Sequence, residues 1–144
     1  MTQYQWAEGF RPPKNVSAED LGRAIERLEE PTPEALFEAS KEAEHVLHSH
    51  LWSEGDKVWA NRARVEECRH IIGGYRGITI VGGKTITFRP VEFLREQGEG
   101  RWARMEEIIA DKSLHHAYMA EIKRLQQQAL NKMETFMILL NEQD

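Results

Sequence analysis

The chain has 144 residues, of which 40% are hydrophobic and 30% are charged, enough for a single domain with a lean core. It holds no run of about 18 apolar residues and only one cysteine, which argues against a membrane-spanning helix, an internal disulfide and a cysteine-rich zinc module. The net charge of −5 is unevenly placed, because residues 57–104 carry ten basic against five acidic side chains and acidic residues prevail on either side.

Residues 1–16 are predicted to form an N-terminal arm. Pro12 and Pro13 exclude a helix there, and Trp6 and Phe10 can hold the arm against a surface. The first residues do not join a basic start to an apolar stretch, so no signal peptide is expected and the predicted location is the cytoplasm.

A helical part is predicted over residues 17–72, and it begins with two capped helices. Ser17 can accept a backbone N–H at the start of the first helix, which Pro31 ends. Thr32 and Pro33 follow in the order of a cap and a first helical residue, so a second helix begins there. Apolar residues at helical spacing indicate one buried face on each helix. These residues are Leu21, Ile25 and Leu28 in the first helix, and Leu36, Ala39, Ala43 and Leu47 in the second.

The stretch EHVLHSHLW, residues 44–52, gathers His45, His48 and His50. A helical zinc pair usually has its histidines four residues apart and a third ligand elsewhere, whereas His48 and His50 would point to different sides of a helix. The stretch is therefore predicted to be a structural helix end without a metal, although a site that adds Cys68 or His70 is an alternative. Trp52 is expected to be buried where the second helix meets a third.

The third helix is predicted from about Asp56 to Ile72, where Gly73-Gly74 stops it. Its predicted apolar face comprises Val58, Val65, Cys68 and Ile72, with Trp59 and Ala63 beside it.

Residues 77–89, GITIVGGKTITFR, have the alternation and the glycines of a β-hairpin. A two-residue turn at Gly82-Gly83 would pair isoleucines with threonines across the strands. A three-residue loop that also includes Lys84 would gather four apolar residues on one face, which buries more apolar surface, so this register is the one predicted. The four residues are Ile78, Ile80, Ile86 and Phe88.

Residues 90–144 are predicted to be C-terminal helices: short ones over 90–97 and 101–110, and a long one over 114–141 capped by Ser113. Apolar residues of the long helix follow in steps of 4, 4, 3, 4, 4, 3 and 4, close to a heptad seam. They are Leu114, Tyr118, Ile122, Leu125, Ala129, Met133, Phe136 and Leu140. The last turns hold more apolar residues than one face can bury, which predicts at least a homodimer. The predicted interface residues are Leu125, Met133, Phe136 and Leu140.

Motifs that carry catalysis or bind a cofactor are not found in the chain. Cys68 lies on an apolar helix face, which is typical of a buried, inert thiol. The chain has no G-x-S-x-G turn, no H-E-x-x-H pair and no phosphate loop, and VGGK is better explained as a hairpin turn. We therefore expect a non-catalytic protein without a cofactor, and a metal-dependent enzyme that uses the histidines is a third alternative.

The basic middle of the chain is the feature most typical of a binding surface. Arginine and lysine beside a β-ribbon can follow a phosphate backbone. The predicted nucleic-acid-binding residues are Arg62, Arg64, Arg69, Arg76, Lys84 and Arg89. The same residues can instead pair with the protein's own acidic helices, within or between subunits, and the overall acidity favours that alternative.

The runs AEDLGRAIERLEEPTPEALFEASKEAEHVLHSHLW and VWANRARVEECRHII, followed by TITFRPVEFLR and the long helix, resemble a family of small phage- and prophage-encoded proteins of unassigned function. The similarity covers roughly residues 17–130 and rests on structural motifs that include the Thr-Pro-Glu-Ala helix start, Leu47-His48 and Trp52. This sequence departs from the family at Leu51 and Ser53, and by an insertion around 95–104. The resemblance implies a shared fold and a phage-related role, and it supplies no catalytic residues.

Together these features predict one domain over residues 1–144, mainly α-helical with one β-hairpin (α+β). The leading function is a phage or prophage accessory protein that binds nucleic acid through the basic helix and hairpin. The alternative is a protein-binding or assembly factor, either an inhibitor of a host system or a virion component, which acts through acidic helices and the C-terminal seam. Both place the protein in the host cytoplasm or on the virion, without a membrane partner.

Overall fold

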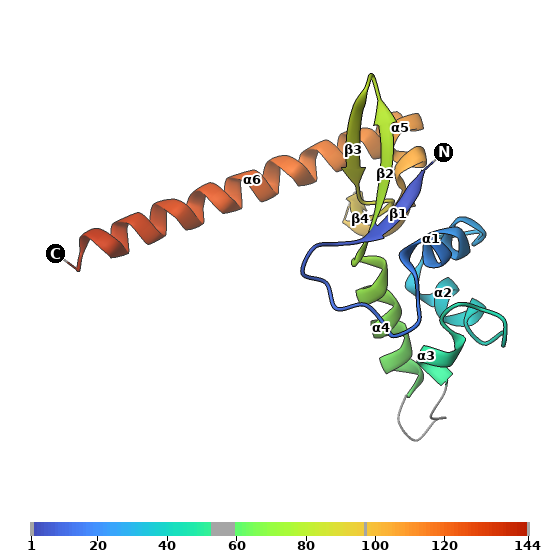
Figure 1. Ribbon diagram of the computed structural model, residues 1–144. Coiled ribbons are helices and arrows are strands. Elements are labelled where there is room, and N and C mark those ends of the chain that lie inside the picture. The colour runs from blue at the N-terminus through green and yellow to red at the C-terminus, as the bar shows by residue number, and fades with distance from the viewer. Residues whose placement is uncertain (1, 53–59, 97, 144) are drawn as a thin grey trace. The chain divides into compact units, whose positions relative to one another are not determined.

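The structure is a computed structural model that describes residues 2–52, 60–96 and 98–143, and it shows a mixed α+β chain with a long C-terminal helix (Figure 1). Within these residues, the helices are α1 (Ala18–Glu26), α2 (Pro33–Ala39), α3 (His48–Trp52), α4 (Asn61–Ile72), α5 (Met105–Ala110) and α6 (Lys112–Asn141). The strands are β1 (Gln3–Trp6), β2 (Tyr75–Val81), β3 (Lys84–Phe88), β4 (Val91–Glu96) and β5 (Glu99–Arg104). The predicted fold class, with helices before and after a central hairpin, is confirmed.

The chain divides into two compact units. The first comprises Met1–Glu92 and Trp102–Met105, and the second comprises Phe93–Arg101 and Glu106–Asp144. Strands β4 and β5, which form a two-stranded sheet, contribute residues to both units. No helix among the described residues is long and apolar enough to cross a membrane. The expectation of one domain over 1–144 stays a prediction.

The first two helices begin at the predicted caps. Ser17 Oγ accepts a hydrogen bond from the backbone N–H of Asp20 at 3.0 Å, and Thr32 Oγ1 accepts one from Ala35 at 3.0 Å. Pro33 is the first residue of α2, where its missing N–H would have had no helical partner. Both starts follow from local backbone chemistry, which is why the sequence predicts them.

The first unit has a core that joins α1, α2 and α4. Leu21 and Ile25 are buried and Leu28 packs beside them, as predicted for the first helix. On α4, Cys68 and Ile72 are buried as predicted. The full buried cluster is Val16, Leu21, Ile25, Leu36, Phe37, Leu47, Leu51, Cys68, Ile71, Ile72, Tyr75 and Val91.

The second helix is shorter than predicted. Helix α2 ends at Ala39 instead of continuing to Leu47, and short turns lead from it to α3. Ser40 is fully buried, and its Oγ donates a hydrogen bond to the carbonyl oxygen of Phe37 at 2.6 Å. A serine side chain that bonds nearby backbone competes with helical hydrogen bonding. His45 therefore lies in the turns after α2, and the other two histidines of the stretch lie in α3.

Helix α4 begins at Asn61, after Ala60, whose backbone is extended. Residues 56–59 of the predicted start, including Val58 and Trp59, lie outside the described residues. The helix ends before Gly73-Gly74, as predicted. A side chain at Gly74 would overlap the ring of Phe10, so glycine allows that ring to pack against the end of α4.

The predicted arm over 1–16 is in part a strand. Strand β1 pairs antiparallel with β2, so the sheet has the order β1-β2-β3. Tyr4 and Trp6 pack against the core while Gln3 and Gln5 are exposed, the alternation expected of a half-buried strand. After the strand, Phe10 stacks on Trp6 with the ring centres 5.4 Å apart.

The β2–β3 hairpin has the two-residue turn in place of the predicted three-residue loop. Ile78 pairs with Thr87, which is the register of a turn at Gly82-Gly83. Gly82 and Gly83 have φ values of 58° and 80°, as a type I′ turn requires. Ile80 is 73% exposed, so gathering the isoleucines on one face would bury little surface. Turn geometry therefore decides the register.

Residues 91–104, predicted to be mostly helical, form the strands β4 and β5 instead. Leu94 and Arg95 favour helices when considered alone, but strand pairing overrides a preference that is only a fraction of a kcal/mol per residue. Gly98, with a φ of 85°, lies in the loop that reverses the chain. A side chain at Gly100 would overlap the Phe93 ring, so this glycine also serves the hairpin.

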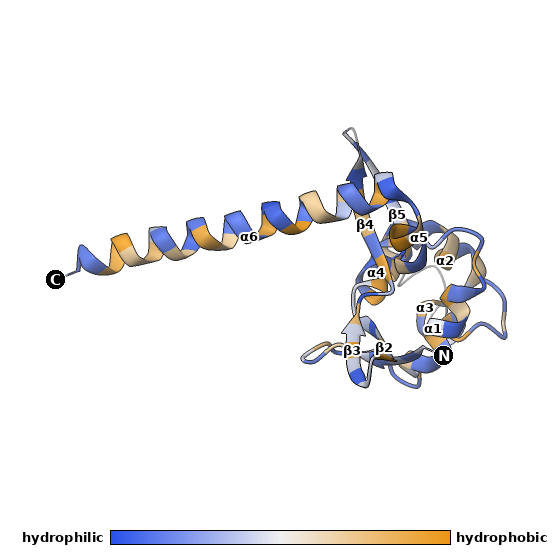
Figure 2. Cartoon of the chain, turned by 90° about the horizontal axis from the view of Figure 1, so that it is seen from above, coloured by the Kyte–Doolittle hydropathy of each residue, from blue (hydrophilic) through white to orange (hydrophobic). Residues whose placement is uncertain are grey.

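Helix α6 begins two residues before the predicted start, and Asp111 caps it in place of Ser113. Asp111 Oδ1 accepts the N–H groups of Ser113 at 2.9 Å and Leu114 at 3.2 Å. Leu114 is buried, whereas every described residue from Lys123 onward is exposed. Apolar and polar bands alternate along the helix (Figure 2).

Candidate nucleic-acid interface

Helix α4 has one buried line of side chains and one exposed line. Arg64 and Cys68 are fully buried, four residues apart on the same face. Arg62, Glu66 and Arg69 are exposed on another face. Arg69 Nε lies 3.7 Å from Glu66 Oε1. An exposed ion pair of this kind contributes little to the stability of the fold, so a phosphate can take the place of the Glu66 carboxylate beside Arg69.

Arg64 does not belong to the predicted binding surface, because it is fully buried. Its Nε donates to the carbonyl oxygen of Leu51 at 3.1 Å, and its Nη1 donates to Asn61 Oδ1 at 3.1 Å. Its guanidinium carbon lies 3.7 Å from the centre of the Trp52 ring. Arg64 therefore ties α3 to α4 and cannot reach a ligand in solvent.

Arg76 and Arg89 lie close together at the base of the β2–β3 hairpin, whose two strands form a ribbon. Arg76 Nη1 donates to the carbonyl oxygens of Gly73 and Tyr75, each at 2.9 Å, and so satisfies the C-terminal end of α4. Burial and then the positive charge of Arg89 lower the pKa of Arg76. Arg89 Nη1 lies 3.9 Å from Glu92 Oε2. Two arginines against one carboxylate leave an excess of positive charge here.

Lys84 is exposed at the tip of the ribbon, directly after the glycine turn. The predicted basic residues thus fall into three places on the first unit. Arg62 and Arg69 lie on the exposed line of α4, Lys84 lies at the ribbon tip, and the half-buried Arg76 and Arg89 lie at the ribbon base.

A hollow of about 470 Å³ beside α4 adds two basic residues, Arg11 and Lys14, that were not in the predicted set. The rings of Phe10 and His70 lie 4.8 Å apart, which holds this loop against α4. In the sequence, Arg11 and Lys14 are recognisable as two basic residues that flank Pro12-Pro13. Nothing in the sequence, however, shows that this loop packs against α4. The hollow is lined by Phe10, Arg11, Pro12, Pro13, Lys14, His50, Glu67 and His70.

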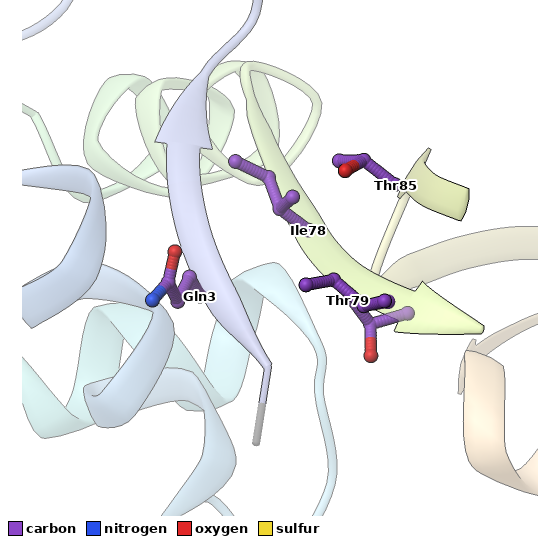
Figure 3. Close-up of a pocket in the computed structure, with 5 residues that line it drawn as sticks. Gln3, Ile78, Thr79 and Thr85 are labelled. Carbon is purple, nitrogen blue, oxygen red and sulfur yellow. The ribbon is translucent and has the colours of Figure 1, made fainter. Parts of the chain in front are cut away.

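A second hollow, of about 310 Å³, lies at the sheet (Figure 3). Gln3 from β1, Ile78 and Thr79 from β2 and Thr85 from β3 line it together with Ile80. None of these side chains ionises near neutral pH, so the hollow offers no acid, base or strong metal ligand.

The stretch EHVLHSHLW is held by hydrogen bonds to Ser40. His48 Nδ1 lies 2.8 Å from the Ser40 carbonyl oxygen, and Trp52 Nε1 donates to Ser40 Oγ at 3.1 Å. Trp52 is half-buried rather than buried, and it lies between the two helices that it was expected to join, because it stacks on Phe37 of α2 and contacts Arg64 of α4. In residues 2–52, 60–96 and 98–143, no group of three potential ligands could hold a metal ion. The absence of a metal in the protein stays a prediction.

Cys68 is the buried thiol that its position on the helix predicts. Burial, with smaller contributions from Glu67 and Glu34, raises the pKa of the Cys68 thiol to about 12. The thiol is therefore protonated at neutral pH, and a protonated thiol is a poor nucleophile.

Neither a protein-family model nor a curated protein nor a solved structure matches the chain, so its function has to be inferred from its own residues.

Proposed function

We propose that this is a non-catalytic nucleic-acid-binding protein that uses the exposed face of α4 and the β2–β3 ribbon. The observation that carries the proposal is that α4 leads through Gly73-Gly74 directly into the ribbon, so one continuous segment presents a helix, a ribbon and their cations. These cations are Arg62, Arg69, Arg76, Lys84 and Arg89.

The shape of this segment supports the proposal. An α-helix and a two-stranded ribbon both fit the major groove of B-DNA, and exposed arginines reach phosphates and the edge of guanine. Arg62 and Arg69 are seven residues apart, which is about 10 Å along a helix and places both on one edge. Each cation that neutralises a phosphate releases counterions, so these residues supply affinity even without reading sequence.

Each group has its own role in this proposal. Arg62 and Arg69 meet the groove, while Lys84 meets the backbone at the far end of the ribbon. Arg11 and Lys14, which line the hollow beside α4, extend the contact to flanking phosphates. Arg76 and Arg89 hold the ribbon to the end of α4 and add positive potential at its base.

The biological setting is part of the same proposal. The resemblance to small phage- and prophage-encoded proteins that the sequence predicts over roughly residues 17–130 is the reason to propose an accessory role in infection, in the host cytoplasm or on the virion. The net charge of −5 keeps the remainder of the chain from binding nucleic acid indiscriminately.

A gel-shift experiment tests the proposal. The full chain is titrated into labelled single- and double-stranded DNA at about 50 mM salt, where phosphate contacts are strong. The unmodified protein should shift a probe, and the double variant Arg62→Glu, Arg69→Glu should not. Arg27→Glu is the control for charge reversal in itself, because it makes the charge change of one of these two substitutions at an exposed position at the end of α1. Absence of any shift by the unmodified protein contradicts the proposal.

An assembly factor, either a host-system inhibitor or a virion component, is the second candidate. The exposed apolar side chains of α6 favour it, because such a surface usually marks a protein contact. They are Leu125, Leu130, Met133, Phe136, Met137, Ile138, Leu139 and Leu140. An oligomer that shifts no probe in the same experiment would support this candidate.

A further inference from the structure

The hollow beside α4 brings three kinds of side chain to one place. It has a volume of about 470 Å³, and cations, aromatic rings and a carboxylate line it. Volumes of about 300–1,000 Å³ are typical of sites for small molecules, in which a few polar groups fix how the ligand lies. The proposed contacts with flanking phosphates use only the cations of the hollow and leave its rings and its carboxylate without a role.

The aromatic side of the hollow is formed by rings in contact. Trp6 stacks on Phe10 with ring centres 5.4 Å apart, and Phe10 meets His70 with ring centres 4.8 Å apart. Phe10 and His70 line the hollow, and His70 is exposed. Proteins hold unpaired bases by stacking them on aromatic side chains, histidine included. His70 therefore offers a surface on which one base can stack.

Glu67 is the one carboxylate among the described residues that line the hollow. Its Oε2 lies 3.5 Å from Nε2 of His50, which belongs to α3. Glu67 is half-buried and precedes His70 by three residues, so the two side chains lie on the same side of α4. His50 thus holds the carboxylate beside the ring on which a base can stack.

A carboxylate only accepts hydrogen bonds, so it distinguishes bases by their donors. The pairing edge of guanine carries two adjacent donors, N1–H and the N2 amine, which match the two oxygens of a carboxylate. Adenine and cytosine have one amine beside an acceptor on that edge, and thymine has one N–H between two acceptors. A carboxylate at this place therefore favours guanine, and only an unpaired guanine presents this edge to a protein.

The cations of the hollow suit the phosphate that a nucleotide carries. Arg11 and Lys14 are exposed and line the hollow together with Glu67. Two cations against one carboxylate leave an excess of positive charge, which attracts an anionic ligand. Arg69, on the exposed line of α4, is the neighbour of His70 in the chain, so the hollow lies beside the line of arginines.

We propose that this hollow binds an unpaired guanine nucleotide. The base stacks on His70, Glu67 accepts its N1–H and its N2 amine, and Arg11 or Lys14 meets its phosphate. Binding of a whole strand rests on the proposed function, in which α4 and the ribbon hold the remainder of the nucleic acid. The hollow adds a preference for a guanine in a single strand or an overhang, which contacts to phosphates alone do not give.

Fluorescence anisotropy on the full chain tests the preference with three labelled strands at about 50 mM salt. The first is all thymine, the second has one guanine, and the third has hypoxanthine in place of that guanine. Guanine should tighten binding about tenfold relative to thymine, the effect of one good bidentate contact. Hypoxanthine keeps N1–H but lacks the N2 amine, so it should lose most of this gain. Equal binding of all three strands overturns the guanine site while the proposed function stands.

The variant Glu67→Gln should remove the preference, because an amide presents a donor in place of one acceptor. Glu66→Gln is the matched control, because it makes the same charge change at an exposed position outside the described lining of the hollow. Both variants lose a negative charge and should bind every strand somewhat more tightly, so the ratio of guanine to thymine affinity is the readout. A ratio that Glu67→Gln leaves unchanged, or that both variants lower equally, overturns the proposal.

Deoxyguanosine monophosphate, titrated by calorimetry, separates this inference from the proposed function. If the free nucleotide binds and Glu67→Gln abolishes that binding, while no strand binds, the site is supported and the proposed function is contradicted. A guanine preference among the strands supports the site whether or not the free nucleotide binds. If neither the strands nor the free nucleotide bind, both proposals are wrong.

Discussion

Arg64 and Trp52 stack on one another where α3 meets α4, with the guanidinium carbon 3.7 Å from the ring centre. Trp52 also stacks on Phe37 of α2, with ring centres 5.7 Å apart. The three residues therefore link three helices through one group of flat side chains. Arg64 of α4 is therefore part of the core, and the planar shape of its guanidinium, rather than its charge, explains why it lies there.

Replacing Arg64 by lysine should lower the free energy of unfolding by about 2–4 kcal/mol, because the variant lacks the guanidinium hydrogen bonds to Leu51 and Asn61 and the stacking on Trp52 while a charge stays buried. Arg62→Lys, on the exposed line of the same helix, should change it by less than about 0.5 kcal/mol. Urea unfolding followed by circular dichroism measures both. Equal stability of the two variants would contradict the structural role of Arg64.

His45 should make the fold sensitive to acid. Its Nδ1 accepts the backbone N–H of Leu47 at 3.1 Å, and its Nε2 is buried with no hydrogen-bond partner among the described residues. Burial, followed by the charges of Arg27 and His48, lowers the pKa of His45. The unfolded chain therefore binds a proton more readily, so stability is full above about pH 6.5 and is lost as the pH falls below it.

The variant His45→Gln should have a flatter dependence of stability on pH than the unmodified chain between about pH 5 and pH 8. Urea unfolding at several pH values gives the two slopes. His116→Gln, on the exposed face of α6, is the control and should leave the slope unchanged. A steeper loss of stability in acid for His45→Gln would show that the sign is wrong.

Cys68 should be unreactive in the folded protein. Its thiol pKa of about 12 leaves almost no thiolate at neutral pH, and the side chain is fully buried. A thiol reagent such as Ellman's should react slowly with the native chain and rapidly in urea. The unfolded thiol loses its proton near pH 9, so stability should fall as the pH rises from about 9 toward 12. Rapid labelling of the native chain would rule out the buried thiol.

The turn of the β2–β3 hairpin should accept asparagine at Gly82 and reject valine at Gly83. Both positions have positive φ, and asparagine followed by glycine is the preferred pair for a type I′ turn. Gly82→Asn should shift the melting temperature little, whereas Gly83→Val should lower stability by about 1–3 kcal/mol. Calorimetry distinguishes them. A tolerated Gly83→Val would indicate a different register.

Features that depend on a few neighbouring residues could be predicted from the sequence. Ser17 and Thr32 cap their helices because the cap is a contact over three residues. Features that depend on distant partners were missed. The strand at Tyr4 exists because β2 pairs with it, although the alternation in QYQW was a usable signal.

The sequence also predicted only part of the candidate binding surface. Arg62, Arg69 and Lys84 are exposed, as a ligand requires. Arg64 is fully buried and cannot contact a ligand. Its spacing of four residues from Cys68 places it on the buried face of the helix, so the sequence held the information to predict this. Arg11 could not be predicted, because its loop reaches α4 only through the packing of the folded chain.

The salt dependence of DNA binding tests the central claim most directly. Fluorescence anisotropy of a labelled duplex should show affinity that falls steeply between about 50 and 200 mM salt. The variant Arg62→Gln, Arg69→Gln should bind more weakly, with the slope of log affinity against log salt reduced by about one unit for each phosphate that the variant no longer neutralises. Arg27→Gln should keep the original slope. Undetectable binding at the lowest salt, or a slope that all three proteins share, would contradict the claim that α4 and the ribbon bind nucleic acid.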